Sequence, residues 1–239
     1  NRAESMVYDQ PDETINITLK LLQKEKKADE VAHLYMLISN AYTVKKNTDS
    51  SLFYILKATD LIKSDALPAT KIKILFSVAI QYQQMELYDK ALESLDKAQE
   101  MIDKLSMTYA EQLYNIGFIN STRGIIYRNQ SNPDLALKKF KITAENFNKL
   151  KLDKKSAANL SINYYNMGIC YLDLAQLQQA FSHFKEAEKY AKIYKENILE
   201  AYSLKGQGES YFLLHQYEQS LKVLNQAEKL AEPIGDLVL

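Results

Sequence analysis

The sequence predicts an all-α fold in which about five helical hairpins stack on one another as one continuous solenoid. The first observation is an internal repeat, because tyrosines recur 40, 45, 44 and 40 residues apart at Tyr42, Tyr82, Tyr127, Tyr171 and Tyr211. The second is composition, since only 6 Gly and 4 Pro occur in 239 residues, which favours helix throughout. A repeat that cannot bury its apolar face alone has to pack on its neighbours. The pattern therefore predicts a binding surface rather than a catalytic pocket.

Each repeat tyrosine has neighbours of fixed character at fixed distances. Small residues lie three before, nine after and sixteen after it, and a large apolar residue lies thirteen after it. In the fourth repeat these positions are Gly168, Ala180, Ala187 and Phe184. We expect the small residues to let the two helices of a hairpin approach closely, with the tyrosine and the large residue filling the remaining space. Burial of each such large side chain contributes about 1.5 to 3 kcal/mol.

The first predicted element is an unpaired helix over Pro11 to Lys24 with regularly placed Ile and Leu residues, which we expect to cap the amino-terminal end. Pro68 separates the first hairpin from the second. The expected segments are a capping helix or half repeat over 1–30, five units over about 31–67, 68–106, 107–152, 153–195 and 196–233, and the start of a truncated following segment over 234–239.

Capping signals mark the later helices. Thr108 with Glu111 three residues on has the form of a capping box, which predicts a long helix leading to Tyr127. The turn after that helix contains Asn132, whose side chain can accept a backbone N–H, and Pro133, which suits the first helical position. Asp153 is expected to cap a similar helix ending near residue 174. In every hairpin the distance from the tyrosine to the second helix is constant, so we expect a rigid module.

Charge and hydropathy exclude several classes of function. The 30 basic and 30 acidic residues cancel, and Arg2, Arg123 and Arg128 are the only arginines, so direct nucleic-acid binding is not expected. No apolar run reaches the roughly 18 residues of a membrane span, so we expect no membrane insertion and a soluble fragment. The chain begins with Asn1 and is expected to be part of a longer protein, cytoplasmic or periplasmic, with the compartment unknown.

Signals for catalysis are missing, and we expect no enzyme, no cofactor and no metal site. His33, His183 and His215 lie far apart and lack the spacing of metal ligands. The single Cys170 falls one residue before a repeat tyrosine, where a packed thiol is expected rather than a nucleophile. The sequence contains no phosphate-binding glycine loop and no nucleophile elbow.

The recurring positions resemble the tetratricopeptide repeat (TPR) family. The small-x-x-Tyr pattern appears at Gly124 to Tyr127, Gly168 to Tyr171 and Gly208 to Tyr211, and the small and aromatic positions of the second helix appear at Ala180 and Phe184. The resemblance runs from residue 31 to residue 233 and implies an α–α superhelix, although these repeats are longer than the family's usual 34 residues. They are similar to the longer-repeat branch of bacterial regulatory proteins and motor light chains.

A second resemblance concerns the start of the chain, where Met6-Val7-Tyr8 and Pro11-Asp12-Glu13 precede long repeats rich in Tyr and Lys. It is similar to the TPR sensor region of bacterial helix-turn-helix transcription regulators. That resemblance implies a signalling role within a longer chain and not an activity of this part of it.

The resemblance also implies a concave groove lined by the first helix of each hairpin, at four offsets from the tyrosine. The residues expected to bind a protein or peptide segment there are Asn40, Phe76, Gln83, Phe118, Ser121, Arg128, Tyr165, Tyr202, Lys205, Glu209 and Phe212. An acidic group or terminal carboxylate of the peptide is expected at Arg128. The alternative is that the groove is filled by its own side chains, for example Ile125, Ile162 and Ile169.

We therefore expect a non-catalytic binding module with a regulatory role. The alternative is a passive scaffold, or a homodimer formed through the final helix and Leu237 to Leu239.

Overall fold

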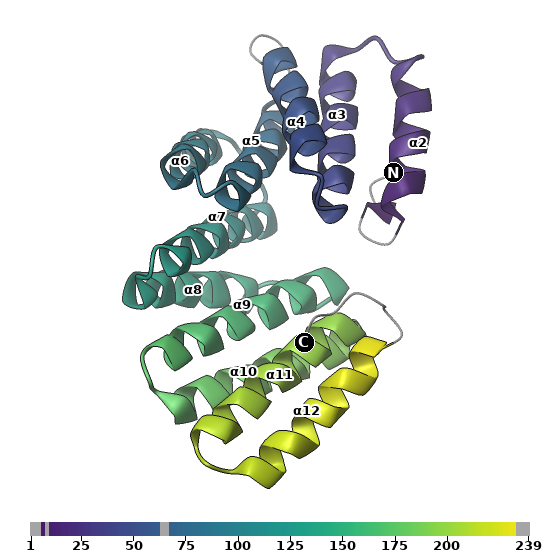
Figure 1. Ribbon diagram of the computed structural model, residues 1–239. Coiled ribbons are helices and arrows are strands. Elements are labelled where there is room, and N and C mark those ends of the chain that lie inside the picture. Colours follow the sequence, from purple (N-terminus) through teal and green to yellow (C-terminus); the bar gives the residue numbers. More distant parts are fainter. Residues whose placement is uncertain (1–5, 8–9, 63–66, 233–239) are drawn as a thin grey trace. The chain divides into compact units, whose positions relative to one another are not determined.

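The computed structural model describes residues 6–7, 10–62 and 67–232. Regular structure in this part of the chain is entirely helical, which confirms the predicted all-α class (Figure 1). The helices belong to two compact units, Asn1–Met107 and Thr108–Leu239. Pro233 and the predicted C-terminal contact residues Leu237 to Leu239 lie outside the described residues, as does Tyr8. None of the described helices is long and apolar enough to cross a bilayer.

Unit 1 contains five labelled helices: α2 (Pro11–Leu22), α3 (Ala28–Val44), α4 (Thr48–Leu61), α5 (Pro68–Gln84) and α6 (Tyr88–Lys104). Helices α3 and α4 form one hairpin, α5 and α6 form the next, and α5 packs on both α3 and α4. Helix α2 packs on α3, so the apolar surface at the start of the first hairpin is covered.

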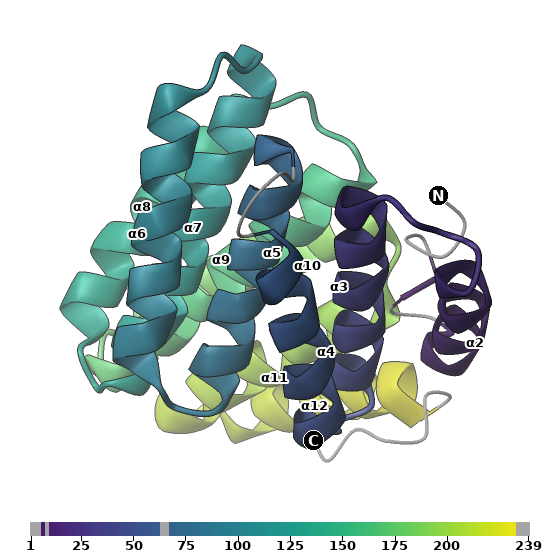
Figure 2. The ribbon, with the colours of Figure 1, turned by 90° about the horizontal axis from the view of Figure 1, so that it is seen from above.

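Unit 2 contains three hairpins, and Figures 1 and 2 both show α7 and α8 lying side by side. Its helices are α7 (Tyr109–Asn129), α8 (Pro133–Phe147), α9 (Lys154–Asp173), α10 (Leu177–Tyr194), α11 (Asn197–Leu213) and α12 (Tyr217–Ala231). The first helices of successive hairpins also touch, because α9 contacts both α7 and α11. In unit 2 the second helix of a hairpin therefore lies between the first helix of its own hairpin and the first helix of the next one, except in the last hairpin.

The turn inside each hairpin has one backbone geometry, repeated five times. In the fourth repeat Ala175 has φ 55°, its N–H donates to the Leu172 carbonyl at 2.8 Å, and the Gln176 N–H donates to the Tyr171 carbonyl at 2.8 Å. This pair of bonds is the Schellman arrangement, which satisfies carbonyls left over at a helix end. The residues in the left-handed conformation lie four after the repeat tyrosine and are Lys46, Glu86, Ser131, Ala175 and His215.

The predicted small-to-large packing is present inside the hairpins. A Cβ atom added at Gly168 would lie 2.5 Å from the Phe184 ring, and one at Gly124 would lie 2.5 Å from the Phe140 ring. Such distances are far below van der Waals contact, so only glycine allows each ring to lie directly on the facing helix. Both phenylalanines are fully buried.

The predicted helix starts are confirmed. Thr108 and Glu111 form a capping box at the start of α7, and the Asp153 carboxylate accepts the Ser156 N–H at 2.8 Å at the start of α9. The Asn132 side chain accepts a backbone N–H in the first turn of α8, as expected. These bonds use the orphan N–H groups of the first helical turn and fix where each helix begins.

Candidate binding surface

The groove residues predicted in unit 2 lie on α7, α9 and α11, the first helices of its three hairpins. Arg128 is in the last turn of α7, Tyr165 is in the middle of α9, and Tyr202 is in the first half of α11. Because α9 contacts both of the other helices, side chains from three repeats converge on one surface.

Arg128 is half-buried and held by amide groups. Its Nη1 donates to the Asn166 side-chain oxygen, and its Nη2 lies 3.4 Å from the Asn129 side-chain oxygen. Asn166 is itself fixed, because its amide donates to the Ile162 carbonyl at 2.9 Å. Among the described residues no carboxylate forms an ion pair with Arg128, whose hydrogen bonds go to neutral amide oxygens. A guanidinium oriented in this way is suited to an incoming carboxylate.

Tyr165 lies at the centre of this surface and packs between two other rings. Its centroid is 5.6 Å from Phe184 and 5.9 Å from Tyr202. Burial raises the pKa of its hydroxyl by more than the nearby Arg128 charge lowers it, and Glu209 and Tyr202 add smaller raising contributions. The phenol therefore stays neutral and can act as a hydrogen-bond donor.

The other predicted residues of unit 2 differ in exposure. Phe118, Ser121 and Lys205 are half-buried, whereas Glu209 is exposed. Phe212 is 58% exposed and contacts the Tyr217 ring edge-on at a centroid distance of 5.6 Å.

In unit 1 the predicted residues lie on α3 and α5. Asn40 and Gln83 are half-buried, and Phe76 is only 8% exposed, so Phe76 presents little surface to a partner. A hydrogen bond from the Gln81 side chain to Thr43 joins these two helices. Gln81 was not among the predicted residues, although it precedes a repeat tyrosine.

The aliphatic residues on the same helix faces behave in two ways. Ile125 packs against the buried cluster that contains Phe140, Met167 and Cys170, as the alternative of a self-filled groove predicts. Ile162, in contrast, is 39% exposed. The surface in unit 2 is thus partly filled by its own side chains, with polar groups and Ile162 left accessible.

The residues considered for catalysis lie in settings that do not activate them. Cys170 is fully buried, and burial raises the pKa of its thiol to about 12, which leaves almost no thiolate at neutral pH. The His183 pKa is lowered, mainly by burial, and its Nδ1 lies 2.8 Å from the Gln179 carbonyl. In the described part of the chain no group of three His, Cys, Asp or Glu residues is placed to hold a metal ion.

A buried charged network between α10 and α11 was not anticipated from the sequence. The Glu188 carboxylate accepts hydrogen bonds from Lys192 at 2.6 Å, Gln207 at 2.8 Å and Lys185 at 3.0 Å. Burial raises the pKa of Glu188, but these three donors lower it by more, so the group stays ionised. Lys185 and Lys192, three residues before and four residues after Glu188, are the sequence pattern that predicts its ion pairs on the same helix. The Gln207 contact crosses between repeats and has no such local signature.

Comparison with solved structures identifies the fold of the chain, whereas comparison of its sequence identifies no family. No family model matches the chain, and no curated protein matches it. Solved structures do match. The chain superposes on the signal transduction ATPase with numerous domains that carries a tetratricopeptide repeat sensor, from Pyrococcus horikoshii, with a TM-score of 0.73 and 19% identity. That match covers 95% of this chain and 34% of the other, so the chain spans about a third of that protein.

Two further structures extend the comparison. BtubC from P. vanneervenii matches with a TM-score of 0.69 and 11% identity, covering 100% of this chain and 94% of its own. Aspartyl phosphate phosphatase F from Bacillus subtilis matches with a TM-score of 0.59 and 14% identity, covering 97% of this chain and 62% of its own. At such identities the likeness concerns the fold alone. Together with the repeated hairpins, it shows that the chain has a tetratricopeptide-type, all-α superhelical fold.

Proposed function

We propose that this chain is a non-catalytic module that binds a protein or peptide segment and serves as the regulatory or sensor part of a larger bacterial protein, such as a transcription regulator. The observation that carries the proposal is Arg128, a half-buried cation with no carboxylate partner among the described residues, fixed by Asn166. A cation held in place by neutral groups, with no carboxylate bonded to it, is suited to recognising an acid from outside.

The bound segment would lie along α7, α9 and α11. Its acidic side chain or terminal carboxylate pairs with Arg128, and its apolar side chains contact Tyr165, Tyr202 and Phe118. A ligand that bridges three hairpins changes their relative angles, which is how binding would be transmitted to an attached domain.

The test uses synthetic peptides prepared in pairs, one with a free C-terminal carboxylate and one amidated. For a peptide that binds through the carboxylate, we expect Arg128→Ala to weaken binding by about tenfold or more, since the loss of a charge-assisted contact removes at least 1.4 kcal/mol. Arg123→Ala on the same helix is the matched control and should bind like the unmodified protein. Equal affinity of all three proteins for every peptide would remove Arg128 from the site.

The non-catalytic part of the proposal rests on the buried thiol of Cys170 and the neutral His183. One neighbour in fold is named as a phosphatase, so the relevant check is phosphate-ester and acyl-phosphate hydrolysis. We expect no release of phosphate from acetyl phosphate or p-nitrophenyl phosphate above the buffer rate. Turnover that survives repeated purification would contradict the proposal.

A passive scaffold or homodimer is the second candidate, favoured by apolar residues on the last helix. Tyr217 and Leu221 on α12 are 56% and 62% exposed. If two copies associate there, light scattering should show a dimer that Leu221→Lys converts to monomer. A monomer at all concentrations would leave the sensor role as the better supported function.

A further inference from the structure

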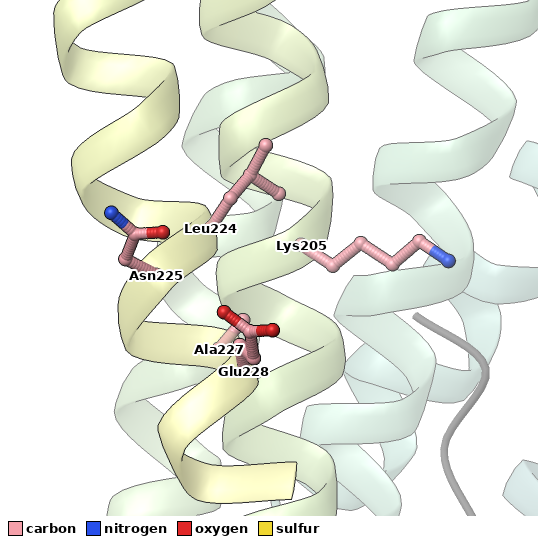
Figure 3. Close-up of a pocket in the computed structure, with 5 residues that line it drawn as sticks. All are labelled: Lys205, Leu224, Asn225, Ala227 and Glu228. Atoms are coloured by element: carbon pink, nitrogen blue, oxygen red, sulfur yellow. The ribbon is translucent and has the colours of Figure 1, made fainter. Parts of the chain in front are cut away.

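A pocket of about 230 Å³ lies on the last hairpin, at the end of unit 2. Leu224, Asn225, Ala227 and Glu228 contribute to it from α12, and Lys205 contributes from α11 (Figure 3). The Lys205 side chain extends away from α12 in this view, so its hydrocarbon stem rather than its ammonium group borders the pocket.

Each lining residue stands forty residues after a residue of the preceding hairpin. Lys205, Leu224 and Glu228 correspond in this way to Tyr165, Phe184 and Glu188, and Asn225 and Ala227 correspond to Lys185 and Ala187. The pocket is therefore the last copy of a surface that also occurs one hairpin earlier in the same unit.

In the earlier copy this surface is covered by α11. The Tyr202 ring lies 5.9 Å from that of Tyr165, and the Gln207 amide donates to Glu188 at 2.8 Å. Gly206 lies directly on Phe184, since a Cβ added there would be 2.5 Å from the ring. Helix α11 is thus held on this surface by three contacts, made by Tyr202, Gly206 and Gln207.

In the last copy the same positions are open. Leu224 is 38% exposed, whereas Phe184 is fully buried. Glu228 is exposed, whereas Glu188 is buried. The two lysines that neutralise Glu188 are replaced by Asn225 and Glu232, so Glu228 has no cation at the matching positions of its own helix.

We propose that this pocket is a docking site for one α-helix of a partner protein, in the place that α11 takes on the hairpin before. The partner helix presents a small residue to Leu224, a basic residue one position later to Glu228, and an acidic residue four positions before the small one to Lys205. The charge assignment follows from complementarity, because Glu228 is exposed at the pocket and Lys205 borders it with the stem of a basic side chain. Lys205 has four flexible methylene groups, which let its ammonium group reach the acid.

The sequence argues against a second copy of this chain as the occupant. In the 239 residues no Asp or Glu is followed four positions later by Gly, Ala or Ser and five positions later by Lys, Arg, Gln or Asn. A second copy of the chain therefore offers no helix with the required pattern.

The test uses a defined probe, a capped and fluorescently labelled peptide with the sequence of α11, Asn197–Leu213, carrying Tyr202→Glu and Gln207→Lys. We expect it to bind the full chain in a saturable way by fluorescence anisotropy. The same peptide with Gly206→Leu should lose binding by about tenfold or more, because the larger side chain collides with Leu224. Equal binding of the two peptides, or none by either, would overturn the proposal.

Exchanging the two charges in the protein tests whether the probe peptide binds at this pocket. The double variant Lys205→Glu, Glu228→Lys should bind the probe about tenfold more weakly and should recover affinity for a peptide with Tyr202→Lys and Gln207→Glu. Arg128→Ala, which tests the proposed groove, should leave probe binding unchanged, so the two proposals fail independently. Probe affinity that is indifferent to the charge exchange would overturn the assignment.

Experiments on the parent protein, the charge-exchange variant and a truncated form distinguish a partner helix from two other possible occupants of the pocket. A concentration-dependent dimer in sedimentation experiments that the charge exchange abolishes would assign the pocket to a second copy and overturn the proposal. Probe binding that occurs only after truncation behind Glu232 would assign the pocket to the chain's own C-terminal residues, with the same consequence. Binding by the full-length monomer supports a partner helix.

Discussion

Glycine at the hairpin interface has a measurable steric role. Gly168 and Gly208 occupy the same repeat position, and an added Cβ would lie 2.5 Å from Phe184 in one case and 2.6 Å from Leu224 in the other. Phe184 is enclosed by two helices, whereas Leu224 is partly exposed. The same substitution should therefore have different costs at the two sites.

We expect Gly168→Leu to reduce the free energy of unfolding by about 1 to 3 kcal/mol through overpacking against Phe184. Gly208→Leu is the matched control and should cost less, because Leu224 can move towards solvent. Urea denaturation followed by circular dichroism measures both. Equal losses, or no loss at position 168, would contradict the packing scheme.

Residue roles were predictable from the sequence where the repeat itself defines them. In the three hairpins of unit 2 the glycine before the tyrosine and the large residue thirteen after it lie against each other as expected, since helical geometry fixes their faces. The hydrogen bond from Arg128 to Asn166 was not predictable, because it joins two helices and Asn166 lies at none of the four repeat positions expected to line the groove. Which groove residues bind a partner stays a prediction.

At the scale of single elements, the hairpin turns hold non-glycine residues in a left-handed conformation. Ala175 has φ 55°, a region that costs an L-residue about 1–2 kcal/mol. Glycine avoids that cost but has a more flexible unfolded state. We expect Ala175→Gly to stabilise the protein by about 0.5–1 kcal/mol and Ala175→Val to destabilise it, as measured by thermal unfolding. Destabilisation by glycine would show that the turn is not strained.

The contact between α10 and α11 depends on Glu188. Glu188→Leu keeps the side-chain volume but leaves the buried Gln207 amide without its acceptor, so we expect a loss of about 1–3 kcal/mol. Glu186→Leu removes an exposed pair with Lys189 and should change stability by less than about 1 kcal/mol. Chemical denaturation of the two variants compares the buried and the exposed carboxylate directly.

The Glu188 contribution also has a pH signature. Its pKa in the folded state is lowered from 4.5, so the stabilisation is present above that pH and is lost as the pH falls through the folded-state pKa. The stability difference between the parent protein and Glu188→Leu should therefore shrink in acid. A difference that is constant from pH 7 to pH 3 would mean that Glu188 does not stabilise as an anion.

At the scale of the whole molecule, the even balance of charge predicts solution behaviour. With 30 basic and 30 acidic residues and a pI of about 7.0, repulsion between copies is weakest near neutral pH. We expect solubility in polyethylene glycol precipitation to pass through a minimum near pH 7. Replacing the exposed Lys138 and Lys149 by Glu should move that minimum to lower pH. A solubility independent of pH would rule out charge as its cause.

The fold class was predictable because five repeats carry the same pattern, so errors at single positions cancel. The division into two compact units was not predictable. Repeat offsets are the same on both sides of Met107, so the sequence contains no signal there. The pocket on α12 was not predictable from the sequence either, because it exists only where no described helix covers the last hairpin as α11 covers α10.

The turn geometry has a consequence for how such chains diverge. The two hydrogen bonds that close each hairpin join main-chain atoms only, and the left-handed position carries Lys, Glu, Ser, Ala and His in turn. A duplicated hairpin can therefore exchange most of its loop side chains over evolutionary time and still close at the same angle. The backbone of such an array therefore tolerates wide change in its sequence, which is consistent with solved structures that share this fold at 11% and 19% identity.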